Sequence, residues 1–150
     1  MWNVLVVDDS ATSRALLERI LVRMGHRPLV ADCGARALSI CEVEHPDIML
    51  LDVMMPDIDG WELAARLREI DSLRSVPIVF QSSVETQEEI DRCLACGASE
   101  IIAKPVRAAR LEGVFISLLG IPMLPPQFMS MRPMASIAAL PYSMPIGYAV

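Results

Sequence analysis

Four short apolar runs in this chain each lead into polar side chains that could bind a cation or an anion. The runs cover residues 4–7, 48–51, 78–80 and 101–103. An acid pair, a single acid, a hydroxyl and an amine follow them, at Asp8-Asp9, Asp52, Ser82 and Lys104. In an open parallel sheet, ligands bind beyond the carboxyl ends of the strands. If the runs are neighbouring strands, these side chains converge on one pocket suited to a divalent cation and a phosphoryl group.

The charges of such a pocket would need compensation. Three carboxylates held close together repel one another, and one takes up a proton unless cations intervene. Mg²⁺ prefers oxygen ligands, usually a few carboxylates together with waters and phosphate oxygens. Lys104 is the only lysine, against twelve arginines, and its ammonium could supply the remaining positive charge. The strand exits therefore indicate a Mg²⁺ site beside an amine.

The composition is that of an acidic chain with enough apolar residues for a core. Hydrophobic residues make up 53% of the 150 residues, and the formal net charge is −6. A nucleic-acid-binding face is usually basic, so no direct nucleic-acid partner is predicted. No run reaches the roughly 18 apolar residues of a membrane span, and no signal peptide opens the chain. We therefore expect a cytoplasmic location and no membrane partner.

The four cysteines lack the spacing of a disulfide framework, which also favours a reducing compartment. Cys93 and Cys96 form a C-x-x-C sequence. A redox pair of this kind normally opens a helix, where the dipole lowers the thiol pKa, whereas this pair closes a predicted helix. No second ligand pair has zinc spacing. We predict that both are buried or half-buried side chains.

Strand-like and helix-like stretches alternate through residues 1–120, which we interpret as one domain. Apolar residues recur at helical spacing in each helix-like stretch. The first shows this at Leu16, Leu17, Ile20, Leu21 and Met24. The helices are expected near residues 12–24, 34–44, 61–70, 85–96 and 107–119. Five βα units predict an α/β fold with a doubly wound parallel sheet. Right-handed crossovers leave few arrangements, of which we expect the known flavodoxin-like order 2-1-3-4-5.

Residues 121–150 have a different character. They hold six prolines, five methionines and a single charge, at Arg132. The spacing of the prolines excludes a long helix. We predict a mostly irregular Pro/Met-rich tail.

Taken together, these motifs resemble the receiver domain of two-component response regulators, the CheY-like family. The resemblance covers about residues 2–120, and four motifs occur in the expected order at intervals that match βα units. They are Asp8-Asp9, Asp52-Val53-Met54-Met55-Pro56-Asp57-Ile58-Asp59-Gly60, Ser82 and Lys104-Pro105.

The resemblance implies a role for each matching residue. Asp52 is expected to be the phosphoacceptor. Asp9 is expected to bind Mg²⁺ directly, with Asp8 beside it and the backbone carbonyl of Met54 as a further ligand. Ser82 and Lys104 are expected to contact the phosphoryl group. The resemblance also implies that Pro105 follows a cis peptide bond. Independently of it, turn chemistry predicts that Asp57 and Asp59 shape the loop after Asp52 together with Gly60.

The resemblance also implies partners. The phosphoryl group would come from a histidine kinase or a phosphotransfer protein, and a downstream effector protein or domain would read the result. Signalling would pass through the face of the fourth helix, fifth strand and fifth helix, which could also form a homodimer. Family members often carry an aromatic switch residue three positions before the lysine. That position is Ile101 here, so aromatic switching is in doubt.

Two other functions are compatible with some of these residues. An aspartyl-phosphate hydrolase of the haloacid dehalogenase type needs a D-x-D sequence directly after its first strand. The D-x-D sequence here, Asp57-Ile58-Asp59, lies in a Pro/Gly loop instead. A degenerate receiver could serve as a scaffold, although all the key side chains are present. The residue that supplies the hydroxyl to the phosphoryl group could also be Ser83 instead of Ser82, because the two serines are adjacent.

Overall fold

The predicted alternation of strands and helices is present in the computed structural model, which describes residues 1–83 and 86–120. The expectation of an irregular tail at 121–150 lies outside the described residues. The elements in chain order are β1 (Asn3–Val7), α1 (Ala11–Arg23), β2 (Arg27–Ala31), α2 (Gly34–Cys41), β3 (Ile48–Asp52), α3 (Gly60–Arg68), a 3₁₀ turn (Asp71–Leu73), β4 (Ile78–Ser82), α4 (Gln87–Ala95), β5 (Glu100–Ala103) and α5 (Ala108–Leu119).

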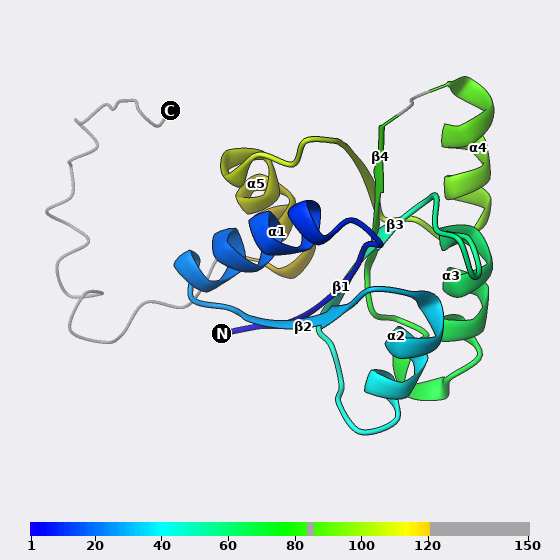
Figure 1. Cartoon of the computed structure of the whole chain (residues 1–150), viewed down its shortest axis with the longest axis horizontal. Helices are drawn as coiled ribbons and strands as arrows, with labels where there is room; N and C mark the ends of the chain where they lie inside the picture. Colours follow the sequence, from blue (N-terminus) through cyan, green and yellow to red (C-terminus); the bar gives the residue numbers. More distant parts are fainter. Residues whose placement is uncertain (84–85, 121–150) are drawn as a thin grey trace, which may run out of the picture. The chain divides into compact units, whose positions relative to one another are not determined.

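The five strands form one parallel sheet in the order β2-β1-β3-β4-β5. The predicted fold class and strand order are thus confirmed. Every residue of β3 and β4 is buried, as expected for central strands covered on both faces. Figure 1 shows α1 and α5 on one side of the sheet, and α2, α3 and α4 on the other.

Each face of the sheet has its own apolar cluster. Leu5, Leu51 and Phe80 pack under α2, α3 and α4, whereas Leu50 and Val79 pack under α1 and α5. Side chains alternate between faces along a strand. Asp52 therefore shares the α1/α5 face with Leu50, two residues earlier.

Local signals in the sequence set the helix ends. Ser10 and Thr86 accept hydrogen bonds from the backbone amides of Ser13 and Glu89, so they cap the first turns of α1 and α4. Gly25 has a φ of 85°, which allows the chain to turn sharply after α1. The buried stripe of α1 is narrow: Leu17, Ile20 and Leu21 are buried against the sheet, whereas Leu16 is 40% exposed.

The strand register aligns the exits of the central strands. Asp52 lies opposite Gln81 on β4, and Ser82 lies opposite Ala103, the residue before Lys104. The amide of Asp8 donates to the carbonyl of Ala31, which extends the β1–β2 ladder by one residue. The polar residues after β1, β3, β4 and β5 therefore meet at one edge of the sheet. Among the helices described, none has the length and apolarity needed to cross a membrane.

Candidate functional site

The carboxylates of Asp8, Asp9 and Asp52 form an acidic cluster in which one oxygen from each lies within 4.8 Å of the others. The first two follow β1, and Asp52 ends the neighbouring strand β3. Their exposures differ sharply. Asp8 is fully buried and Asp52 is 5% exposed, whereas Asp9 is exposed. The cluster is therefore open to solvent on the side of Asp9.

Lys104 reaches this cluster from the exit of β5. Its Nζ lies 3.0 Å from Oδ2 of Asp8 and 3.1 Å from Oδ1 of Asp52. The backbone amide of Lys104 donates to the carbonyl of Ser82, and the Lys104–Pro105 peptide bond is cis. The hydrogen bond holds the backbone of Lys104 beside the end of β4. The ammonium is thereby held between two carboxylates from different strands.

The cluster shifts the pKa values of Asp52 and Lys104. Burial, together with the charge of Asp8, raises the pKa of Asp52 to about 6, although Lys104 acts in the opposite direction. Burial alone would lower the pKa of Lys104, but its contacts with Asp8 and Asp52 outweigh burial and raise it. At neutral pH the site therefore holds an ammonium and a carboxylate that gains from further positive charge.

A cavity of about 220 Å³ opens directly above these groups. Its lining comprises Asp9, Asp52, Val53, Met54, Ser82, Ser83, Glu89 and Lys104. The structure thus brings Asp52, Ser82 and Lys104 to one polar cavity, as the sequence predicts. Ser83 lines the same cavity. Lining the cavity therefore does not distinguish Ser82 from Ser83 as the phosphoryl-binding hydroxyl, and their other contacts must. Ser82 is 4% exposed, and its hydroxyl donates a 2.9 Å hydrogen bond to the carboxylate of Glu89.

The loop after Asp52 is shaped by carboxylates and by one glycine. Asp59 caps α3 by accepting from the amide of Glu62 at 2.8 Å. Asp57 accepts from the amides of Gly34 and Ala35, at the start of α2. Both acids of the D-x-D sequence therefore cap helices, which argues against a hydrolase of the haloacid dehalogenase type.

Two residues near the site have no motif in the sequence that would have identified them. Glu89 is one of several acids expected in the first turn of a helix, and only the tertiary structure places its carboxylate on Ser82. Gln81 is 1% exposed and lies opposite Asp52, yet neither polar atom of its side chain has a hydrogen-bond partner among the described residues. A single glutamine in an otherwise apolar strand does not indicate that its side chain lies opposite Asp52.

Two further expectations concern residues outside the acidic cluster. Cys93 is buried and Cys96 is half-buried, as predicted, and burial raises the pKa of both thiols. Ile101 is half-buried and packs against the apolar cluster under α2, α3 and α4. Cys93, Cys96 and Ile101 therefore all belong to the packing of α4 and β5 in that apolar cluster.

The acidic cluster fits a hard divalent cation. Mg²⁺ prefers oxygen ligands in octahedral geometry and usually keeps several waters. Asp8, Asp9 and Asp52 supply oxygens that lie close together. Asp9, Asp52 and Met54 line the open cavity, whereas Asp8 is buried. No thiol or imidazole takes part in the cluster, so its donors suit magnesium better than zinc.

Comparisons with known proteins agree with this geometry. Residues 4–115 match a sequence model of the response regulator receiver domain. The rice protein "Two-component response regulator ORR11" (Oryza sativa subsp. japonica) is 35% identical over 118 residues, which cover 78% of this chain and 80% of that protein. Another rice relative, ORR7, is 34% identical over 117 residues, and the match spans 56% of its length.

Solved structures show the same fold. The chemotaxis protein CheY4 of Vibrio cholerae has a TM-score of 0.76 and 26% identity, over 79% of this chain and 98% of that one. The receiver domain of a sensor histidine kinase from Pseudomonas aeruginosa has a TM-score of 0.74 and 26% identity, over 80% and 98% of the two chains. That structure was solved with a magnesium ion coordinated in the active-site cleft. Together with the matching sequence model, these likenesses show that the chain belongs to the receiver-domain family of two-component response regulators.

Proposed function

We propose that this receiver domain is a phosphoacceptor switch in a two-component phosphorelay and that Asp52 accepts the phosphoryl group. The observation that carries the proposal is the position of the Asp52 carboxylate. It lines an open polar cavity, belongs to the acidic cluster and lies 3.1 Å from the Lys104 ammonium. A group placed on Asp52 would therefore meet a cation on one side and solvent on the other.

The proposed donor is a phosphohistidine of a partner kinase or phosphotransfer protein. A carboxylate oxygen of Asp52 forms the new bond to phosphorus as the bond from phosphorus to the imidazole nitrogen breaks, and the imidazole leaves with the electron pair. Phosphoryl transfer depends mainly on positioning and charge stabilisation. Lys104 is placed to pair with the equatorial oxygens of the phosphoryl group. The hydroxyl of Ser82 is placed to donate a hydrogen bond to one of these oxygens. Water later hydrolyses the acyl phosphate.

Asp9, Asp8, Asp52 and the carbonyl of Met54 would hold Mg²⁺. When bound, the ion neutralises charge on the carboxylates and the phosphoryl oxygens. Asp8 is buried against Lys104 and Asp9 is exposed, which favours Asp9 as the direct ligand and Asp8 as its support. Gly60 would fix the backbone beside Asp52, against which it packs, and Pro105 would fix the backbone directly after Lys104.

The proposed output is a change in the face formed by α4, β5 and α5. A phosphoryl group adds a charge of about −1.5 to −2 and three acceptor oxygens, which can reorder a neighbouring loop. Ser82 ends β4, directly before the segment that leads to α4. A downstream effector, or a second copy of this domain, would bind the altered face. Ile101 supplies no aromatic ring for this change, so other side chains must carry it.

Labelling with acetyl phosphate and Mg²⁺ tests the proposed acceptor. We expect intact-mass spectrometry to show one added phosphoryl group on the wild-type chain and none on Asp52→Asn. Asp57→Asn is the control, because it alters an acid in the same loop that lies outside the acidic cluster. Persistent labelling of Asp52→Asn would move the acceptor elsewhere, and an unlabelled wild-type chain would favour the scaffold function.

Analytical ultracentrifugation tests the proposed homodimer. We expect the sedimentation coefficient to rise when Mg²⁺ and beryllium fluoride, a mimic of the phosphoryl group, are added. An unchanged monomer across a tenfold range of protein concentration would leave only the effector as the reader of the switch.

A further inference from the structure

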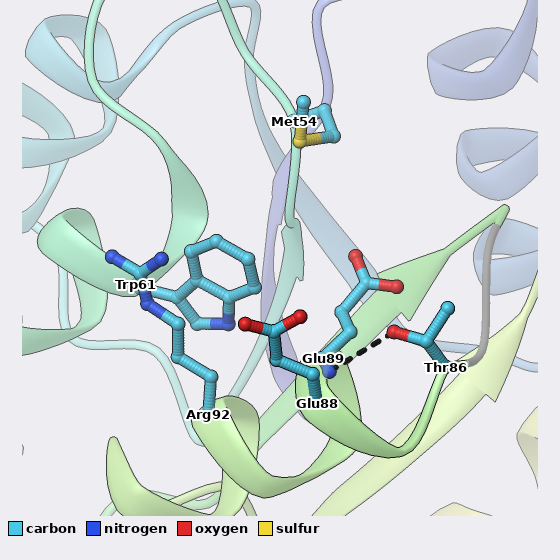
Figure 2. Close-up of a pocket in the computed structure, with 6 residues that line it drawn as sticks. All are labelled: Met54, Trp61, Thr86, Glu88, Glu89 and Arg92. Carbon is cyan, nitrogen blue, oxygen red and sulfur yellow. Dashed lines mark hydrogen bonds between the residues drawn. The ribbon is translucent and has the colours of Figure 1, made fainter.

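The side chain of Glu89 connects two neighbouring cavities. It lines the polar cavity above Asp52, and it also lines a groove of about 400 Å³ whose other walls are Met54, Trp61, Thr86, Glu88 and Arg92. Figure 2 shows this groove, with residues from α3 and α4 facing each other across it. A movement of the Glu89 side chain would therefore change both cavities at once.

Two contacts fix the present arrangement of the groove. The hydroxyl of Ser82 donates to the Glu89 carboxylate at 2.9 Å, which holds that carboxylate toward the phosphorylation site. The Arg92 guanidinium lies 4.0 Å from the centre of the Trp61 ring, a cation–π contact. Figure 2 shows the Glu89 carboxylate and the Arg92 guanidinium pointing to opposite sides. In the described part of the chain, no ion pair joins Arg92 to Glu88 or Glu89.

The hydroxyl of Ser82 has one proton to donate, so it cannot serve two acceptors at once. The Glu89 carboxylate accepts this hydrogen bond in the present structure. A phosphoryl group on Asp52 would compete with Glu89 as the acceptor. The same phosphoryl group would bring further negative charge into a cavity that Glu89 lines together with Asp9 and Asp52. The loss of its donor and the repulsion of like charges both act to expel the Glu89 carboxylate from the site.

The groove offers the expelled carboxylate a partner. Glu89 and Arg92 are three residues apart on α4, a spacing at which side chains on a helix meet and opposite charges attract. If Arg92 turns toward Glu89, it leaves the face of Trp61, and the groove changes both its shape and its charge. The route from the phosphorylation site to α4 then runs through a carboxylate and needs no aromatic residue at Ile101.

We infer that Glu89 is a latch that restrains Ser82 before phosphorylation, and that its release rearranges the Trp61–Arg92 groove. The inference rests on the proposed function, since it takes Asp52 as the acceptor. It adds a residue that no receiver motif in this sequence marks, and a second phosphorylation-dependent surface on the α3–α4 side of the domain.

The test combines a binding titration with a double-mutant cycle. Beryllium fluoride is titrated with Mg²⁺ present while Trp61 fluorescence is followed in a Trp2→Phe background, which leaves Trp61 as the sole tryptophan. We expect Glu89→Ala to lower the half-saturating concentration about three- to tenfold, since Ser82 no longer has to be released from a charged acceptor. The change in Trp61 fluorescence on saturation should become smaller, because no carboxylate is freed to draw Arg92 away.

The cycle separates the latch from a plain charge effect. In a Ser82→Ala background the latch is already absent, so Glu89→Ala should shift the half-saturating concentration by less than about twofold. Glu88→Gln is the matched control: it removes a neighbouring charge that does not contact Ser82, and it should titrate like the wild type. Equal shifts from Glu89→Ala with and without the Ser82→Ala substitution, or the same shift from Glu88→Gln, would overturn the latch.

Acetyl phosphate labelling of the same variants distinguishes this failure from failure of the proposed function. A wild-type chain that takes up no phosphoryl group would refute the acceptor role of Asp52, and the latch with it. A wild-type chain that is labelled, while Glu89→Ala titrates identically to it, would refute the latch alone. Glu89→Leu, which also lacks an acceptor for the Ser82 hydroxyl, provides a second variant in case the alanine variant folds poorly.

Discussion

Gly60 packs directly against the backbone carbonyl of Asp52, so closely that a β-carbon at residue 60 would collide with it and with the Cα of Val53. The amide of Gly60 also donates a 2.8 Å hydrogen bond to the carbonyl of Val53. Both neighbours are backbone and cannot rotate aside. We therefore expect Gly60→Ala to lower the free energy of unfolding by about 2–3 kcal/mol and to displace the loop after Asp52. Urea denaturation followed by circular dichroism measures the loss.

Gly113 provides the matched control for that substitution. It lies inside α5, and a β-carbon there would meet no heavy atom within 4 Å apart from the neighbouring backbone of its own helix. Because glycine in a helix interior is less favourable than alanine, Gly113→Ala should raise the free energy of unfolding by about 0.5–1 kcal/mol. Similar losses from both substitutions would contradict the close packing between Gly60 and Asp52.

Lys104→Met tests the charge compensation inside the acidic cluster. The variant removes the ammonium that lies 3.0 Å from the fully buried Asp8 and 3.1 Å from Asp52. Because this leaves uncompensated charge in a buried site, we expect it to lower the free energy of unfolding by about 2–3 kcal/mol at pH 7.5 without Mg²⁺. Arg107→Met removes an exposed cation at the start of α5 and should change stability by less than about 0.5 kcal/mol.

The pH dependence of this loss has a definite sign. Lys104 lowers the pKa of Asp52, so without it that pKa should lie still higher. A carboxyl group whose pKa is higher in the folded than in the unfolded state destabilises the fold at neutral pH and less so as pH falls. The deficit of Lys104→Met, measured by urea titration, should therefore shrink between pH 7.5 and pH 5. A deficit that grows on acidification would contradict this account.

The parts of the site that the sequence predicts are those fixed by strand exits. Asp52 and Lys104 follow apolar runs, and in a parallel sheet such positions meet at one edge whatever the details of packing. Right-handed crossovers leave few arrangements of five βα units, and the order 2-1-3-4-5 is one that doubly wound sheets commonly adopt. Spacing along the chain, together with the resemblance to the receiver family, was enough for these features.

The features that were missed depend on side chains that reach across from another element. Glu89 contacts Ser82 only because α4 lies beside the exit of β4, and Asp57 caps α2 from a loop more than twenty residues away in the chain. Periodicity marks the apolar face of a helix but not where a polar side chain on its first turn will point. The exposure of Leu16 has a similar cause, since the width of the buried stripe depends on how α1 lies on the sheet.

Arg68 joins three separate segments near the amino ends of the strands. Its guanidinium donates to the carbonyls of Leu73, Val76 and Gly97, at 2.8, 2.6 and 3.3 Å. Arg68→Met should lower the free energy of unfolding by about 1.5–3 kcal/mol, because these carbonyls lose a charged donor. The control is Arg66→Met, which removes only an exposed pair with Glu62 and should cost about 0.5 kcal/mol or less. Equal urea midpoints for the two variants would show that the three carbonyl contacts contribute nothing.

Magnesium binding should depend on pH through Asp52. Its pKa of about 6 in the metal-free protein means that a proton competes with the ion below that pH. We expect the apparent Kd for Mg²⁺ to be nearly constant above pH 7 and to rise toward tenfold per pH unit below pH 6, with about half a proton released per ion bound at pH 6. Calorimetry in two buffers of different ionisation enthalpy measures both quantities. Asp52→Asn should bind the ion more weakly and lose most of the pH dependence between pH 5 and 7.5. A wild-type Kd that stays constant across that range would contradict this account: either Asp52 is already ionised at pH 5, or it does not bind the ion.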